Sequence, residues 1–227
     1  MDLLDWARGP LLTLALTVFV VGVAWRLWAL WRLPAPHALD TRARRHFGMG
    51  AALGMALTRT VPKGGFHPSA TLVTFNPYLF HIGLALIFFG YAPHIAFVHR
   101  LTGLHWPALP DWVMYLAAGV TIVSMLVALA FRITDPVLRK ISRMDDWISW
   151  TVTFLPVLTG MAVVGEPSSQ ILARGLHTVY REPLAIHLLT VELLLIWFPF
   201  GKLMHAFLVV PSRMQLAMFF GRRGVQT

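Results

Sequence analysis

The sequence predicts an all-α integral membrane protein, a five-transmembrane-helix bundle with the N-terminus outside and the C-terminus cytoplasmic. The first observation is composition, because 57% of the 227 residues are hydrophobic and 13% are charged, against about 25% charged in an average soluble domain. The second is that apolar runs near the ~20 residues that cross a bilayer recur along the chain. The third is an uneven division of positive charge among the segments that join these runs.

Five apolar runs are long enough to cross about 30 Å of hydrocarbon as helices. Helices are expected because lipid offers no partner to an unpaired backbone group. The first run lacks a preceding basic segment and a following small-residue cleavage site, so we expect a retained helix rather than a signal peptide. Residues 1–227 then form a single membrane domain. The expected helices cover approximately residues 10–31, 76–98, 112–133, 148–166 and 184–208.

The positive charges predict the orientation. With five spans, 15 of the 19 Lys and Arg residues fall on the side that holds the C-terminus. The positive-inside rule therefore places the C-terminus in the cytoplasm and the N-terminus outside. Because the net charge of +9 follows this topology, nucleic-acid binding is not needed to explain it. The four residues on the outer side are Arg8, Arg100, Arg174 and Arg181.

The longest polar segment is the basic cytoplasmic loop 34–72, which is rich in Arg, His, Gly and Pro. Two interpretations stay open: contact with anionic membrane lipid, or a docking platform for a soluble subunit. The chain contains no cysteine, so it builds no cysteine-held iron–sulfur cluster or disulfide. Any iron–sulfur cluster must belong to a partner.

Four of the ten histidines lie in or near apolar spans. His81, His187 and His205 are well inside them, and His94 is near the outer end of the second span. Ionisable residues inside a bilayer are costly and usually face the interior of the bundle, where they serve a function. Neutral imidazole is a standard axial ligand of haem iron. A second imidazole on the other porphyrin face must come from another helix.

The spacing of the histidines predicts an inner pair. His187 and His205 are 18 residues apart, which is five turns of an ideal helix and about 27 Å of rise. The second span enters from the cytoplasm and the fifth returns to it, so His81 and His205 are expected at similar depth. We therefore expect these two residues to ligate one haem iron.

The outer pair is less determined by spacing. His94 is the first candidate partner for His187, but the 13 residues from His81 to His94 rotate an ideal helix by about 220°. Pro93 is expected to distort that geometry. His99 would share the face of His81 in a continuous helix and is the substitute ligand.

At these residues the sequence resembles a known family. LFHIGLALIFFG (79–90) and IHLLTVELLLIWFPFGKLMHAFLVVPSR (186–213) are similar to the haem-bearing helices of the respiratory nitrate reductase gamma subunit. The related membrane cytochromes of sulfite-reduction complexes are similar too. The resemblance covers the second span through the C-terminus, whereas the first span matches in topology alone.

The resemblance implies five helices, two b haems stacked across the membrane, quinol oxidation near the outer haem, and electron transfer from the inner haem to a cytoplasmic iron–sulfur subunit. By motif, the inner-haem ligands fall on His81 and His205, and one outer-haem ligand falls on His187. The second outer ligand of the family falls on Tyr91, so His94 and His99 both remain candidates. Quinone chemistry also transfers protons, and Glu192 is the candidate proton acceptor.

We therefore expect a haem b cytochrome subunit in the cell (inner) membrane of a bacterium or archaeon. It would be the quinol-oxidising or quinone-reducing electron-transfer subunit of a respiratory oxidoreductase complex, with a cytoplasmic iron–sulfur subunit and a catalytic subunit as partners. Two alternatives remain. One is a proton or metal-ion transporter or channel that uses the intramembrane His and Glu residues. The other is a haem-free membrane anchor.

Overall fold

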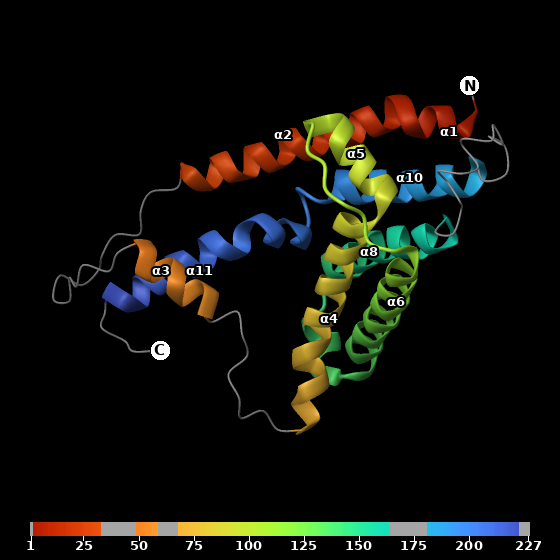
Figure 1. Cartoon of the computed structure of the whole chain (residues 1–227). Coiled ribbons are helices and arrows are strands. Elements are labelled where there is room, and N and C mark those ends of the chain that lie inside the picture. Colours follow the sequence, from red (N-terminus) through yellow and green to blue (C-terminus); the bar gives the residue numbers. More distant parts are fainter. Residues whose placement is uncertain (1, 33–48, 59–67, 164–180, 223–227) are drawn as a thin grey trace.

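The computed structural model describes residues 2–32, 49–58, 68–163 and 181–222, and every regular element in them is a helix (Figure 1). Most of the loop 34–72 lies outside these residues. The helices are α1 (Leu3–Trp6), the π-helix η1 (Ala7–Leu11), α2 (Leu12–Trp31), α3 (Met49–Thr58), α4 (Pro68–Gly90), α5 (Ala92–Thr102), α6 (Asp111–Thr134), α7 (Pro136–Ile141), α8 (Met144–Val163), α10 (Arg181–Trp197), the 3-10 turn η2 (Lys202–Met204) and α11 (His205–Arg222).

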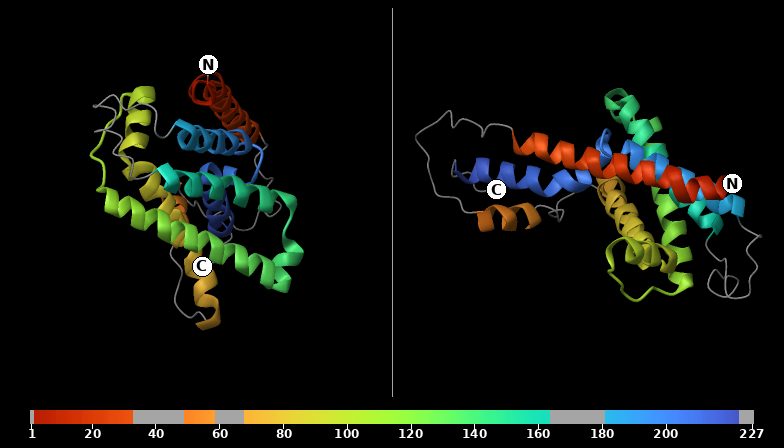
Figure 2. Two further views of the ribbon diagram at one scale, coloured as in Figure 1. Left: turned by 90° about the vertical axis from the view of Figure 1, so that its right-hand side faces the viewer. Right: turned by 90° about the horizontal axis from the view of Figure 1, so that it is seen from above.

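Neighbouring helices pack in a row. α4 lies on α6, α6 on α8 and α8 on α10, and α2 lies along the other side of α10 (Figures 1 and 2). α3 and α11 form a separate pair beside this row. As a result α8 and α10 lie antiparallel, since Ser149 near the start of α8 meets Trp197 at the end of α10.

Glycine allows two of these helix contacts to be close. A Cβ on Gly83 of α4 would collide with the Thr121 hydroxyl of α6. A Cβ on Gly22 of α2 would lie 2.6 Å from Cγ of Pro199, which follows α10. Helices inside lipid lack a hydrophobic driving force for packing. Small residues let their backbones approach closely, so that van der Waals contacts hold the helices together.

The expected second span, 76–98, is wrong as a single helix. α4 ends at Gly90, Tyr91 is extended, and α5 restarts at Ala92. The cause is Pro93, which has no N–H to donate to the Phe89 carbonyl four residues earlier. The indole Nε1 of Trp106 donates to that carbonyl instead, at 2.6 Å.

The expected fifth span, 184–208, is also wrong as a single helix. α10 ends at Trp197, and a turn over residues 198–201 leads into η2 and α11. Pro199 removes one helical hydrogen bond here. At Gly201 a Cβ would overlap the indole ring of Trp197, so this position requires glycine. The five-turn argument for His187 and His205 therefore fails, because they stand on two helices.

In the part of the chain that the structure describes, four helices are long and apolar enough to cross a membrane. They are Leu3–Trp31, Thr71–Gly90, Asp111–Thr134 and Lys202–Gly221. Large apolar side chains on them are exposed, such as Val21 at 62% and Leu72 at 65%, as expected where lipid covers them. The chain thus has the helices of a multi-pass membrane protein. The expected spans 148–166 and 184–208 correspond to α8 and α10–α11.

Candidate functional site: two histidine pairs

The inner pair joins α4 to α11. The ring centroids of His81 and His205 are 5.9 Å apart, and the ring planes lie at 85°. Nδ1 of His81 is hydrogen-bonded to the carbonyl of Pro77, and Nδ1 of His205 to the carbonyl of Lys202 at 2.7 Å. A carbonyl only accepts, so each Nδ1 carries the proton. Nε2 then holds the lone pair that a metal requires.

The outer pair joins α5 to α10. The ring centroids of His94 and His187 are 6.3 Å apart, and the planes are 18° from parallel. Nδ1 of His94 donates to the carbonyl of Ile87 at 3.0 Å. This pairing exists because the chain breaks at Tyr91. The break removes the 220° rotation that a continuous helix would impose on His94.

His187 is held by α8. Its Nδ1 is 3.1 Å from the Thr159 hydroxyl, which itself donates to the Leu155 carbonyl at 2.8 Å. Because the hydroxyl proton is directed to that carbonyl, the oxygen accepts from Nδ1–H of His187. The ring lies over Gly160, where a Cβ would be 3.1 Å from its Cε1. Threonine and glycine together define where this imidazole lies.

The donor set of each pair fits a six-coordinate haem iron. A metal–imidazole bond is about 2 Å and the ring centroid lies about 1 Å further, so two axial imidazoles have centroids about 6 Å apart. Ligating histidines usually donate their other ring nitrogen to an acceptor, as all four do. No group of three or more His, Cys, Asp or Glu in the described residues would hold a metal ion alone. Among the described residues each pair thus consists of two imidazoles without a third side chain of these types.

Space between the ligand-bearing helices is the second requirement. The close helix contacts run α4 to α6 and α10 to α8 and α2, whereas α4 and α5 make no broad contact with α10 or α11 in the described residues. The imidazole pairs extend across this separation. A haem held by either pair would require that these helices are not closely packed.

His99 does not join the outer pair. Its ring lies 5.7 Å from that of His105, at 81°. The two imidazoles line a hollow of about 500 Å³, together with Arg100, Trp106 and the apolar residues Ala92, Ile95, Ala96 and Ala108. The expectation that His99 substitutes for His94 is therefore not supported by the geometry.

Glu192 lies on α10. Its position is about 140° around the helix from His187. The residue is 4% exposed. Its Oε1 is the buried side-chain oxygen or nitrogen without a hydrogen-bond partner among the described residues.

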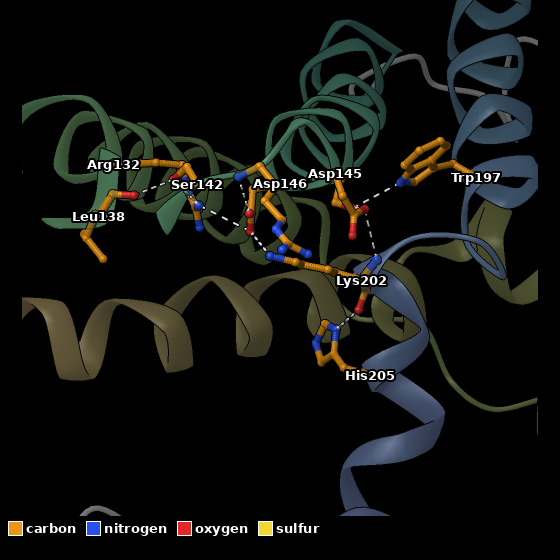
Figure 3. Close-up of polar contacts among 10 residues, drawn as sticks. Arg132, Leu138, Ser142, Asp145, Asp146, Trp197, Lys202 and His205 are labelled. Atoms are coloured by element: carbon orange, nitrogen blue, oxygen red, sulfur yellow. Dashed lines mark hydrogen bonds and ion pairs between the residues drawn. The ribbon is translucent and has the colours of Figure 1, made fainter. Parts of the chain in front are cut away.

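A polar cluster at the start of α8 supports the turn before His205 (Figure 3). The Lys202 ammonium is 2.6 Å from Oδ1 of Asp146, and Arg132 of α6 is 3.3 Å from the same oxygen. Burial alone raises the pKa of Asp146, but hydrogen bonds from the Arg143 amide and Lys202, with the charges of Arg132 and Lys202, leave the pKa lowered. Asp146 is thus a stable anion.

The sequence is similar along its length to a protein of Nitratidesulfovibrio vulgaris strain Hildenborough, described as "Protein". The two are 31% identical over 232 residues, which cover 96% of this chain and 94% of the relative. The chain belongs to the family of that protein. No family model matches the sequence. The relative's description names no activity, so the similarity shows common ancestry and does not indicate a function.

Sequence reasoning named His81, His205, His187 and His94, and the structure brings these four together in two pairs. It missed Thr159, Gly160, Asp145 and Asp146, which support two of the rings. The sequence contains a weak signal for these carboxylates, because Asp145 and Asp146 begin an otherwise apolar segment. Carboxylates near a membrane boundary usually have a cationic partner.

Proposed function

We propose that this chain is the b-type cytochrome membrane subunit of a respiratory oxidoreductase complex. It would carry electrons between the membrane quinone pool and a cytoplasmic iron–sulfur subunit that serves a catalytic subunit. The observation that supports this proposal is the presence of two imidazole pairs at the separation of axial haem ligands. The resemblance to nitrate reductase gamma subunits, at the same histidines, is consistent with it.

The proposed topology has five spans, formed by α1–α2, α4–α5, α6, α8 and the stretch from α10 through η2 to the first turn of α11, which includes His205. The N-terminus would be outside and the C-terminus in the cytoplasm of a bacterial or archaeal cell. The basic residues Arg132, Arg139, Lys140, Arg143 and Lys202 would then lie at the cytoplasmic end. The pair His81–His205 becomes the inner site and His94–His187 the outer site.

A bound haem would supply reversible one-electron transfer at its iron. The chain supplies the rest of the function. The four imidazoles would hold the two irons, and their Nδ1 hydrogen bonds would fix the ligating tautomer. The surrounding helices would limit water at the outer site, where His94 and His187 are partly buried, whereas His81 and His205 are exposed on the helices. Stacking the sites along the bundle would let electrons cross the membrane.

The hollow beside α5 is the proposed quinone headgroup site. Its volume of about 500 Å³ falls in the range of small-molecule pockets, which combine apolar walls with a few converging polar groups. Here the polar groups are His99, Arg100 and His105. His99 and Arg100 stand on α5, about 140° and 120° around the helix from His94, and His105 stands on the segment that follows α5, so headgroup and outer haem would share one helix. Glu192 on α10 does not line this hollow and remains the proposed proton acceptor, reached through intervening groups.

The experiment is optical and uses the full chain in membranes supplied with iron and haem precursor. Dithionite-reduced minus oxidised spectra should show b-type absorption with two components. His81→Ala or His205→Ala should remove one component, and His94→Ala or His187→Ala the other. His105→Ala is the matched control and should leave both. A colourless wild-type protein would overturn the proposal and favour a transporter, a channel or a haem-free anchor.

A further inference from the structure

Two adjacent carboxylates at the start of α8 hold Lys202 at both of its ends. Oδ1 of Asp145 accepts the Lys202 backbone N–H at 3.2 Å. Oδ1 of Asp146 accepts from Nζ of the same lysine at 2.6 Å. Figure 3 shows the lysine extended between them. Backbone and side chain of Lys202 are therefore fixed by one neighbouring helix.

The carboxylates are themselves fixed. The Asp146 side chain is 9% exposed and is shared with Arg132, and its Oδ2 accepts the Arg143 backbone N–H at 2.9 Å. Asp145 accepts from the Ser149 hydroxyl at 3.1 Å. That hydroxyl in turn accepts from the Trp197 indole N–H. This network ties the last turn of α10 and the first residue of η2 to α8.

Lys202 connects the network to a ligand imidazole. Its carbonyl oxygen accepts from Nδ1–H of His205 at 2.7 Å. The carbonyl determines both the proton position and the rotation of the ring. The carboxylates that clamp Lys202 therefore determine where that carbonyl points.

We propose that Asp145 and Asp146 are positioning residues for His205, and that through Lys202 they set the ring orientation and the redox potential of the inner site. The inference rests on the proposed function, because it requires His205 to ligate haem iron. A partner that orients a ligating histidine normally lies next to it. Here the orientation is relayed to His205 through Lys202 from Asp145 and Asp146, which stand on a different helix.

The charges of Asp146 and Lys202 predict the direction in which each substitution shifts the redox potential. An oxidised haem carries one more positive charge than a reduced one, so a nearby anion stabilises the oxidised form. Asp146→Asn removes the anion and leaves the Lys202 cation unpaired, which favours reduction. Lys202→Gln removes the cation and leaves the anion, which favours oxidation. The two ends of one ion pair should thus shift the potential in opposite directions.

The experiment is a redox titration of the full chain, followed by the absorbance of the inner component and by electron paramagnetic resonance of the oxidised protein. For Asp146→Asn we expect the ratio of reduced to oxidised inner haem at a fixed potential to rise about tenfold, which is 59 mV for a one-electron couple. Lys202→Gln should lower it. Because the residues act together, the double variant should differ from the sum of the single shifts.

Ring orientation needs its own readout. Asp145→Ala frees the Lys202 backbone N–H and should change the low-spin resonance line shape of the inner haem, while the outer haem is unaltered. Asp135→Asn is the matched control, because Asp135 is an acidic cap of α7 that asparagine also satisfies. It should change neither potential nor line shape.

The results separate a failure of this inference from a failure of the proposed function. Unshifted potentials and line shapes in Asp146→Asn, Lys202→Gln and Asp145→Ala, with the inner haem retained, would overturn this inference alone. If Asp146→Asn fails to retain the haem, Lys202→Gln decides, since it keeps the Asp145 contact. A wild-type protein without haem would overturn the proposed function and this inference with it.

Discussion

His94 and His187 face each other with ring centroids 6.3 Å apart and planes 18° from parallel. The rings of the inner pair, in contrast, are close to perpendicular at 85°. The relative orientation of two axial imidazoles determines how they split the iron d orbitals. The two proposed haems should therefore be distinguishable without any substitution.

Electron paramagnetic resonance of the oxidised protein is expected to show two low-spin signals. The inner haem should give a strongly anisotropic signal with a single resolved low-field feature, and the outer haem a rhombic signal with three features. His205→Ala should remove the first signal and His187→Ala the second. Two identical rhombic signals would contradict the perpendicular inner pair.

Thr159→Val should weaken the outer site. The substitution keeps the shape of the side chain but removes the oxygen that accepts from Nδ1 of His187. Loss of such a partner typically costs about 10–100-fold in metal affinity. The measurement is the haem content of the outer component in the purified variant. Thr153→Val is the control, because Thr153 on the same helix bonds only to the Ser149 carbonyl.

Gly160→Ala should displace the His187 ring. The added Cβ would lie 3.1 Å from Cε1, so the imidazole must shift by a few tenths of an ångström. We expect a changed outer-haem signal while the inner haem is unaffected. Gly119→Ala on α6 meets open space and serves as control. Both changes improve helix propensity by up to about 1 kcal/mol, so a defect in Gly160→Ala alone reports on the ring.

Acid should remove the contribution of Asp146 to stability. Its folded pKa is lowered, so the contribution is complete above the ordinary Asp pKa and is lost as pH falls through the lowered value. Asp146→Asn should cost on the order of 1 kcal/mol near pH 7, because Lys202 is half exposed. Thermal unfolding of the full chain in detergent from pH 7 to pH 3 should show the two proteins converging. A constant difference would contradict this assignment.

Glu192→Gln should slow proton-coupled reduction. A naphthoquinol is expected to reduce the haems more slowly, by tenfold or more, while dithionite, which supplies electrons directly, should give the wild-type spectrum. The neutral amide has nearly the same shape, so the packing around this buried position is preserved. Wild-type rates with the quinol would rule out Glu192 as proton acceptor.

The sequence predicted the helical class, and its four central histidines are those that the structure pairs. The expected similar depth of His81 and His205 agrees with the proximity of their rings, although the premise of one continuous helix was wrong. Pro199 and Gly201 lie in the turn that breaks that helix. Hydropathy detects an apolar segment but does not detect a turn within it.

The outer pair shows why spacing alone was insufficient. An ideal helix places His94 on the wrong face, and only the break at Tyr91 turns it toward His187. Pro93 signalled a distortion without giving its direction. Asp145 and Asp146 were not predicted because their partner, Lys202, lies more than fifty residues away and meets them only through the packing of α8 on α10.

The segment from Gly103 to Pro110 covers the break in the second span. Trp106 and Leu109 from this segment satisfy the carbonyls of Phe89 and Gly90, which the interrupted helix leaves without their usual donors. Without this segment, the carbonyl oxygens of Phe89 and Gly90 would lose these hydrogen-bond donors. The end of α4 and this segment should consequently shift as one piece, and Tyr91 and the start of α5, which carries His94, follow directly from that end.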